Sequence, residues 1–355
     1  MSLDTATLES TRAALRAKLD GIVPEFEVDV KAELAYRINR LKVERGAVIL
    51  GHNYMEPALY HSVCDYTGDS LELSRVAATT EADPIIFCGV RFMAETAKIL
   101  NPERTVLLPA LRAGCSLAES ITADDVRGLR ARYPDAPIVA YINTYADVKA
   151  EVDVCCTSSN AAKVVESLES DLVIFLPDEY LAKNVARETG KSIVLPSTAP
   201  VSADARAEAA SNGVHYDIVG WTGRCEVHEK FTVEDVQAVR EQFSDVVVLA
   251  HPECSPEVVD ASDFSGSTAA MTRYVREVEA PRYLLLTECS MGDNIAAEAP
   301  DKDMLRLCSV RCPHMNEITL EHVLVSLREN REQIEVPEDI RLRARRSIDR
   351  MLAIG

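Results

Sequence analysis

The sequence is poor in aromatic and in basic residues, and each scarcity excludes a class of protein. Aromatic side chains make up only 5% of the 355 residues and Trp221 is the single tryptophan, so the core must be mostly aliphatic. Lys and Arg number 38 against 57 Asp and Glu, which gives a formal net charge of -19. A chain this acidic is a poor partner for nucleic acid or for an anionic membrane. We expect neither as a partner, and an anionic substrate must be attracted by local features.

Long apolar segments are also missing. The longest runs, such as residues 246–250, have the length of a strand and are far too short to span a membrane. The N-terminal segment is polar and lacks the apolar region of a secretory signal. We therefore expect a cytoplasmic protein with no membrane association. The content of 47% hydrophobic and 27% charged residues predicts a folded globular chain, long enough for two or three compact units.

The ten cysteines lack the local spacing of a zinc finger or a ferredoxin. Disulfide scaffolds are typical of small secreted chains, so the thiols of a long cytosolic chain are buried, metal-binding or catalytic. Free cysteine is commonly a small buried hydrophobe. We expect most of the ten to be structural, among them the adjacent Cys155 and Cys156, and Cys88 and Cys289 near the middle strands.

Strand-like and helix-like segments alternate along the chain and form three groups with one order: strand with a polar tip, helix with Ser or Thr at its start, strand, helix, strand, cysteine. The pattern predicts an α/β protein with three α/β/α units related by duplication, placed at 46–126, 127–232 and 233–318. Helical flanks are expected at 1–45 and 319–355. The strands expected to open the units are 47–50, 137–143 and 246–250, and the expected helices include 70–80, 92–100, 160–168, 179–189 and 319–353.

Polar side chains follow the first strand of each unit. They are His52, Asn53 and Tyr54 in the first unit, Tyr141 and Asn143 in the second, and His251 and Glu253 in the third. Ligands of open α/β sheets gather at the carboxyl ends of parallel strands, and imidazole, phenol and carboxylate groups suit acid–base chemistry. One such residue alone could equally well satisfy a local hydrogen bond. Seven of them at equivalent places favour a shared site.

Small hydroxyl residues stand at the start of one helix in each unit: Ser70, then Ser158 and Ser159, then Ser267 and Thr268. A helix N-terminus presents unpaired N–H groups and the positive end of the helix dipole, and so binds anions without a basic patch. The alternative for any one of them is plain capping. Three converging helix starts favour a substrate with several carboxylate or phosphate groups.

One cysteine closes each unit: Cys115, Cys225 and Cys312. If the three units met at one centre, three thiolates would suit a [4Fe–4S] cluster with one iron free to act as a Lewis acid. Zinc is the alternative, with ligands from Cys225-x-x-His228 or from Cys308-x-x-x-Cys312. Spacing alone does not decide between the two metals.

The chain resembles the quinolinate synthase family over nearly its whole length. The matching segments occur in the order of the family, and they read GHNY (51–54), GDSL (68–71), FMAETAK (92–98), AGCSL (113–117), YINT (141–144), CTSSNA (156–161), FLPD (175–178), GRCEVHE (223–229), HPEC (251–254), GST (266–268) and CP (312–313). Met55 and His314 differ from the residues that are usual in the family.

The resemblance implies three α/β/α sandwich domains around a pseudo-threefold axis, with one cluster ligand from each: Cys115, Cys225 and Cys312. It implies a transferase of NAD biosynthesis that condenses iminoaspartate with dihydroxyacetone phosphate into quinolinate, phosphate and water. A functional link to an L-aspartate oxidase or dehydrogenase is expected, because iminoaspartate hydrolyses readily. The active-site positions implied are His52, Tyr54, Tyr141, Asn143, His228, His251 and Glu253, and those implied for substrate binding include Ser70, Ser158, Ser267 and Thr268.

As a hypothesis, Glu253 and Tyr54 transfer protons, while His52, Tyr141 and His251 orient the substrates. Two other functions compete with this reading. One is a zinc- or iron-dependent lyase or aldolase with Cys225, His228 and His251 as ligands, and metal analysis distinguishes it. The other is a non-catalytic sensor that carries a labile cluster, which the many acid–base residues at the strand tips disfavour.

Overall fold

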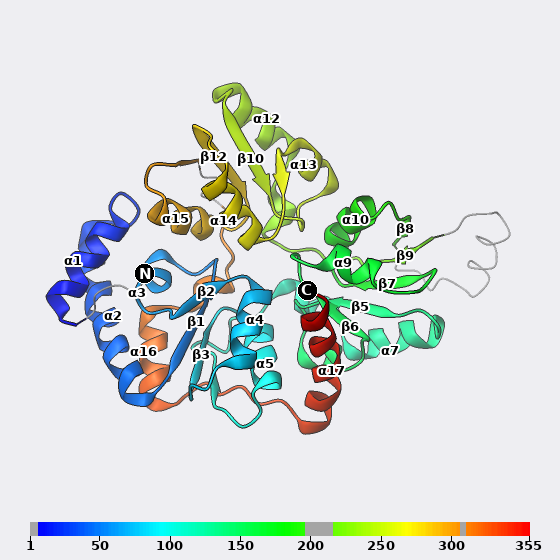
Figure 1. Ribbon diagram of the computed structural model, residues 1–355, viewed down its shortest axis with the longest axis horizontal. Helices are drawn as coiled ribbons and strands as arrows, with labels where there is room; N and C mark the ends of the chain where they lie inside the picture. The colour runs from blue at the N-terminus through cyan, green and yellow to red at the C-terminus, as the bar shows by residue number, and fades with distance from the viewer. Residues whose placement is uncertain (1–5, 196–215, 306–309) are drawn as a thin grey trace.

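The protein folds into three α/β units grouped around a common centre (Figure 1). The structure is a computed structural model and describes residues 6–195, 216–305 and 310–355. Cys308, part of one of the zinc alternatives, lies outside these ranges. Within them, none of the helices combines the length and the apolar character needed to cross a membrane.

Each unit is built on one sheet, and all paired strands are parallel. In the first unit the order is β2 (Tyr66–Gly68), β1 (Val48–His52), β3 (Ile85–Cys88), β4 (Val106–Leu107). In the second it is β6 (Val154–Cys156), β5 (Ile138–Tyr141), β7 (Val173–Leu176), β9 (Ile218–Val219), β8 (Ile193–Val194), and in the third β11 (Phe264–Ser265), β10 (Val246–Ala250), β12 (Arg282–Leu286), β13 (Asp303–Leu305). The first strand of each unit thus lies between its second and third, which confirms three related α/β units.

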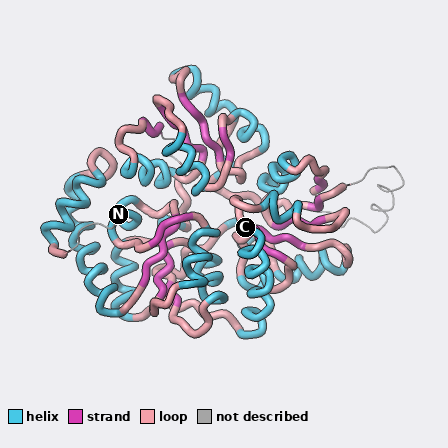
Figure 2. The backbone as a smooth tube through the Cα atoms, viewed as in Figure 1, coloured by secondary structure: helices cyan, strands magenta, loops and turns pink. Residues whose placement is uncertain are grey.

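Helices flank the sheets, whose strands run through the middle of each unit (Figure 2). The central strands β1, β3, β5 and β7 are buried at every residue, as expected of parallel strands covered on both faces. The helices of the units are α3 (Pro57–Ser62), α4 (Ser70–Thr79), α5 (Arg91–Leu100), α6 (Ser116–Glu119), α7 (Ala123–Arg132), α8 (Ala146–Lys149), α9 (Ala161–Glu166), α10 (Glu179–Glu188), α12 (Val233–Gln242), α13 (Pro256–Ala261), α14 (Thr268–Glu277) and α15 (Cys289–Glu298). Two short 3-10 helices, η1 (His228–Lys230) and η2 (Met315–Glu317), follow Cys225 and Cys312.

The two flanks pack against the first two units. Helices α1 (Leu8–Leu19) and α2 (Glu25–Arg45) form a hairpin, and α16 (Leu320–Glu329) packs on α2. Helix α17 (Glu338–Ile354) packs on α8 and β6. The flank expected over 319–353 is helical, but it is divided in two: Asn330 adopts a left-handed conformation that ends α16, and the chain resumes as a helix only after Pro337.

An aspartate at the same place in each unit ties the first two strands together. Its Oδ2 accepts a hydrogen bond of 2.8 Å from a backbone N–H of the first strand. Its carboxylate also forms an ion pair with a basic residue of the helix that comes before that first strand. The ion pairs are Lys42–Asp65, Arg130–Asp153 and Arg240–Asp263, and the N–H donors are Ile49, Ile138 and Val248. This repeated contact supports the duplication and holds the strand tips in equivalent positions.

Candidate active site

A cavity lies where the carboxyl ends of the three sheets converge, and its walls come from all three units. Thirteen of the fourteen predicted site residues line it: His52, Tyr54, Ser70, Cys115, Tyr141, Asn143, Ser158, Cys225, His228, His251, Glu253, Thr268 and Cys312. Ser267 lines instead a second cavity, which shares Asp69 and Ser158 with the first.

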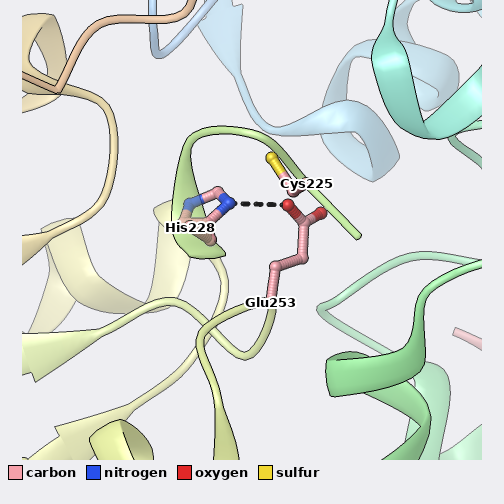
Figure 3. A group of neighbouring side chains, drawn as sticks. All are labelled: Cys225, His228 and Glu253. Carbon is pink, nitrogen blue, oxygen red and sulfur yellow. Dashed lines mark ion pairs between the residues drawn. The ribbon is translucent and has the colours of Figure 1, made fainter. Parts of the chain in front are cut away.

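Glu253 is the central side chain of the cavity and is buried. Its Oε1 accepts a hydrogen bond of 2.5 Å from Tyr141 Oη and one of 3.4 Å from Asn143 Nδ2. Its Oε2 lies 2.7 Å from His228 Nδ1, at angles outside those of a regular hydrogen bond (Figure 3). Burial opposes ionisation, but the imidazoles of His228 and His251 outweigh it and hold the pKa of Glu253 below its ordinary value. The group is therefore a carboxylate held among donors.

His52 and His251 occupy equivalent places in the first and third units. The Nδ1 atom of His52 accepts the backbone N–H of Tyr54 at 3.2 Å, and that of His251 accepts the N–H of Glu253 at 3.3 Å. Burial lowers the pKa of His52 to about 4 and that of His251 to about 3, so both rings are neutral at pH 7. A neutral ring that accepts at Nδ1 carries its proton on Nε2. Each ring thus offers the cavity an uncharged N–H donor.

Tyr54 Oη lies 3.4 Å from His228 Nε2, and both residues also contact Thr287, the residue that follows β12. Thr287 Oγ1 lies 2.5 Å from Tyr54 Oη and 2.9 Å from His228 Nε2. Burial raises the pKa of Tyr54 well above its ordinary value, so the phenol keeps its proton. The sequence analysis missed Thr287 because it considered polar tips only after the first strand of each unit. The same rule applied to the middle strands would have found it.

The three predicted cysteine ligands face the same cavity and sit in the same local turn. In each turn the backbone N–H four residues later donates to the cysteine carbonyl, at 3.0 Å for Glu119, 3.0 Å for Glu229 and 3.2 Å for Asn316. The N–H groups two and three residues after each cysteine face its sulfur, namely those of Leu117 and Ala118, Val227 and His228, and His314 and Met315. Such donors stabilise a thiolate ligand once a metal is bound.

Without a metal these thiols stay protonated. Burial raises the pKa of Cys115 to about 12, that of Cys312 to about 11, and that of Cys225 well above its ordinary value. Three thiols directed at one cavity, each with N–H donors at its sulfur, fit a cluster with three thiolate ligands. Cys88, Cys155, Cys156 and Cys289 are buried and lie outside this cavity, as expected of structural thiols.

A second donor set overlaps the first. Cys225 Sγ, a His228 ring nitrogen and a Glu253 carboxylate oxygen all lie within 4.8 Å of one another and could hold a metal ion (Figure 3). The competing lyase hypothesis expected His251 where this set has Glu253. The ring of His251 is instead stacked on that of His228, with 4.6 Å between their centroids.

The helix starts differ in detail from the expectation. The N-cap of α4 is Asp69, which accepts from the N–H groups of Leu71 and Glu72, so Ser70 is the first helical residue. Ser267 caps α14 and is followed by Thr268. Helix α9 begins only at Ala161, which leaves Ser158 in the turn before it. Ser70, Ser158 and Thr268 reach the cavity, but as wall residues and not as caps.

Comparison with known proteins agrees with this architecture. A family model described as "Quinolinate synthetase A protein" matches residues 36–353. Quinolinate synthase 2 of Mesorhizobium japonicum is 48% identical over 349 residues, which covers 98% of this chain and 100% of that protein. Quinolinate synthase of Xylella fastidiosa (strain 9a5c) is 50% identical over 330 residues, with 93% and 88% covered, and that of Caulobacter vibrioides 44% identical over 352 residues, with 98% and 89% covered. The chain belongs to the quinolinate synthetase A protein family.

Proposed function

We propose that the chain is a quinolinate synthase of NAD biosynthesis, a transferase that condenses iminoaspartate with dihydroxyacetone phosphate and releases phosphate and two molecules of water. One observation carries the proposal: a single cavity receives one cysteine from each unit together with the acid–base residues at the strand tips of all three. The names of the relatives supply the product.

The proposed cofactor is a [4Fe–4S] cluster held by Cys115, Cys225 and Cys312. When bound, its fourth iron supplies a Lewis acid for substrate oxygens. The remaining work falls to side chains of this chain. Neutral N–H donors from His52 and His251 bind carboxylate or phosphate oxygens, aided by the hydroxyls of the cavity wall, Ser70, Ser158 and Thr268, with Ser267 beside them.

Carbon–carbon bond formation requires loss of a proton from the methylene carbon of iminoaspartate. Glu253 is ionised and buried, so we assign it this role, with Tyr141 orienting its carboxylate. Tyr54 also lines the cavity, and we assign it the exchange of a proton with a substrate oxygen. Asn143 Oδ1 is buried and has no hydrogen-bond partner among the described residues, so it can accept from a substrate N–H or O–H.

The supply of substrate is part of the proposal. Iminoaspartate hydrolyses in water, so an L-aspartate oxidase or dehydrogenase must produce it near the enzyme. A cytoplasmic location is also part of the proposal, since thiols stay reduced there.

Metal analysis tests the proposal. The protein is purified anaerobically beside a Cys115→Ala/Cys225→Ala/Cys312→Ala variant and a Cys88→Ala control, whose thiol is buried in β3. We expect about four iron and about four sulfide per chain in the wild type and the control, and neither in the triple variant. An aspartate oxidase then supplies iminoaspartate from L-aspartate, and the wild type should convert it together with dihydroxyacetone phosphate into quinolinate and phosphate.

The overlapping donor set supports one other function, a lyase with a single metal ion at Cys225, His228 and Glu253. Zinc without sulfide, lost on His228→Ala but retained in a Cys115→Ala/Cys312→Ala variant, would replace the cluster proposal with this one.

A further inference from the structure

The side chain of His314 reaches the turn that carries another of the proposed cluster ligands. His314 follows Cys312 by two residues, and its Nε2 atom lies 3.0 Å from Oε1 of Glu226, the residue directly after Cys225. This oxygen is buried and forms no regular hydrogen bond among the described residues, so the imidazole is its ion-pair partner. A carboxylate only accepts, so the ring presents a proton on Nε2 to Glu226. The pair ties the third unit to the second beside two of the three cysteines.

The same ring lies beside the first unit. A Cβ atom added at Gly114, the residue before Cys115, would lie 3.6 Å from His314 Nδ1, which is an ordinary van der Waals distance. Because Gly114 has no side chain, the imidazole can approach the backbone of the Cys115 turn. One ring from the third unit therefore lies against the cysteine turns of the other two.

The pair stands between the metal site and solvent. Glu226 and His314 both line the cavity that receives the three thiols, and their side chains are 34% and 25% exposed. Side chains around a metal site orient its ligands and control the access of solvent to it. His314 also departs from the residue that is usual in the family, so the general pattern of the site does not account for it.

We propose that the Glu226–His314 pair closes the metal site on its solvent side: it holds the Cys225 and Cys312 turns together and slows the loss of iron from the cluster. His314 is then a positioning residue that acts through the cysteine turns. The inference rests on the proposed cofactor. Breaking the pair leaves a buried carboxylate oxygen without its partner, which costs free energy and favours opening of the two turns.

Release of iron to a chelator tests the proposal. The wild type and its variants are purified anaerobically with their cluster, and the coloured iron–chelator complex is followed over time. We expect His314→Ala to release iron about 10-fold faster than the wild type, at the lower end of the range for residues that support metal ligands, because the pair is partly exposed. His314→Gln keeps an N–H donor close to the position of Nε2 and should restore a rate near that of the wild type.

Glu226→Ala breaks the same contact from the other unit. It should speed the release of iron to a similar degree, and it replaces His314→Ala in the test if that variant folds poorly. Adding His314→Ala to Glu226→Ala should change the rate little further, because the two residues act through one contact.

The control is Arg112→Ala. Arg112 pairs with Glu317 at 3.3 Å and so also joins the neighbourhoods of two cysteines, but its side chain is 86% exposed and neither residue lines the cavity. Exposed pairs of this kind contribute little, so the control should release iron as slowly as the wild type.

Three results would overturn the proposal: a wild-type rate in His314→Ala, a rate in His314→Gln as fast as in His314→Ala, or an equal acceleration in Arg112→Ala. Failure of the proposed cofactor looks different. In that case the wild type itself contains no sulfide, and this inference is lost together with the cluster.

Discussion

Replacing Glu253 by Gln tests the proposed base at nearly constant shape. The carboxylate accepts from Tyr141 at 2.5 Å and faces His228 at 2.7 Å with its other oxygen. The glutamine amide keeps one acceptor and turns an NH₂ group toward the other donor, so one charge-assisted contact of about 1.5–3 kcal/mol is lost. The proton-accepting carboxylate is lost as well, which accounts for about 10²- to 10⁴-fold in rate.

We therefore expect kcat of Glu253→Gln to fall at least about 100-fold, equivalent to about 3 kcal/mol in the barrier. The assay is quinolinate formation at saturating substrates, with iron, sulfide and thermal unfolding measured on the same preparation. Iron and sulfide should stay at wild-type levels, because Glu253 is not one of the three proposed cluster ligands.

Glu95→Gln is the matched control. Glu95 is also buried and has two partners, Arg91 Nε and the Ala146 N–H, each at 2.8 Å, but it does not line the cavity. The control should lose stability and keep its kcat. Activity of Glu253→Gln within a few-fold of the wild type would refute the role as base, and loss of iron would make Glu253 a structural residue of the metal site.

Two further predictions concern stability. The pKa of His52 is about 4 in the folded protein against 6.5 in the unfolded chain, so the unfolded chain gains a proton first as pH falls and stability drops between those values. The difference between a pKa of 6.5 and one of about 4 is worth about 3 kcal/mol of stability in full. From pH 7 to pH 5 the free energy of unfolding of the cluster-free wild type, measured in urea, should fall by about 2 kcal/mol more than that of His52→Gln. Equal losses in the two proteins would contradict a buried neutral ring. Asp263→Ala removes the acceptor of the Val248 N–H and should destabilise the protein by about 1–3 kcal/mol, whereas Asp301→Ala, at an exposed loop, should leave the melting temperature unchanged.

The fold was predictable where the pattern is strong. The central strands read as continuous apolar runs because they are buried on both faces. Six of the seven polar residues predicted after the first strands line one cavity, and Asn53 does not. The second strand of each unit escaped prediction: β2 and β11 span three and two residues, and Tyr66 and Thr67 are exposed. Such edge strands are defined by pairing with β1 and β10, which a local pattern does not contain.

The site was predictable only in part, for a related reason. The three cysteines lie 110 and 87 residues apart, so their approach depends on how the units pack. Their place at the end of each repeat suggested a cluster as one of two alternatives, and only the resemblance to a family favoured it over zinc. Thr287 was missed for another reason: it follows the middle strand β12, and only the tips of the first strands were considered. Its partners Tyr54 and His228 belong to the other two units. The unit boundaries proposed from the sequence stay predictions.

The proposed substrates of this acidic chain are anionic, and the cavity would bind them without the help of a basic side chain. Among the described residues that line it there is no Lys or Arg, although the proposed substrates carry two carboxylates and a phosphate. A lysine beside Glu253 would lower the pKa of this carboxyl still further than the imidazoles of His228 and His251 already do, and so weaken it more as a base, because an opposite charge within a few ångströms stabilises the ionised form. Neutral donors avoid this: in the proposed function, the Nε2–H groups of His52 and His251 would bind oxygen anions without adding a full charge. The same burial that keeps these imidazoles neutral at pH 7 therefore lets one cavity bind anions and keep a reactive carboxylate.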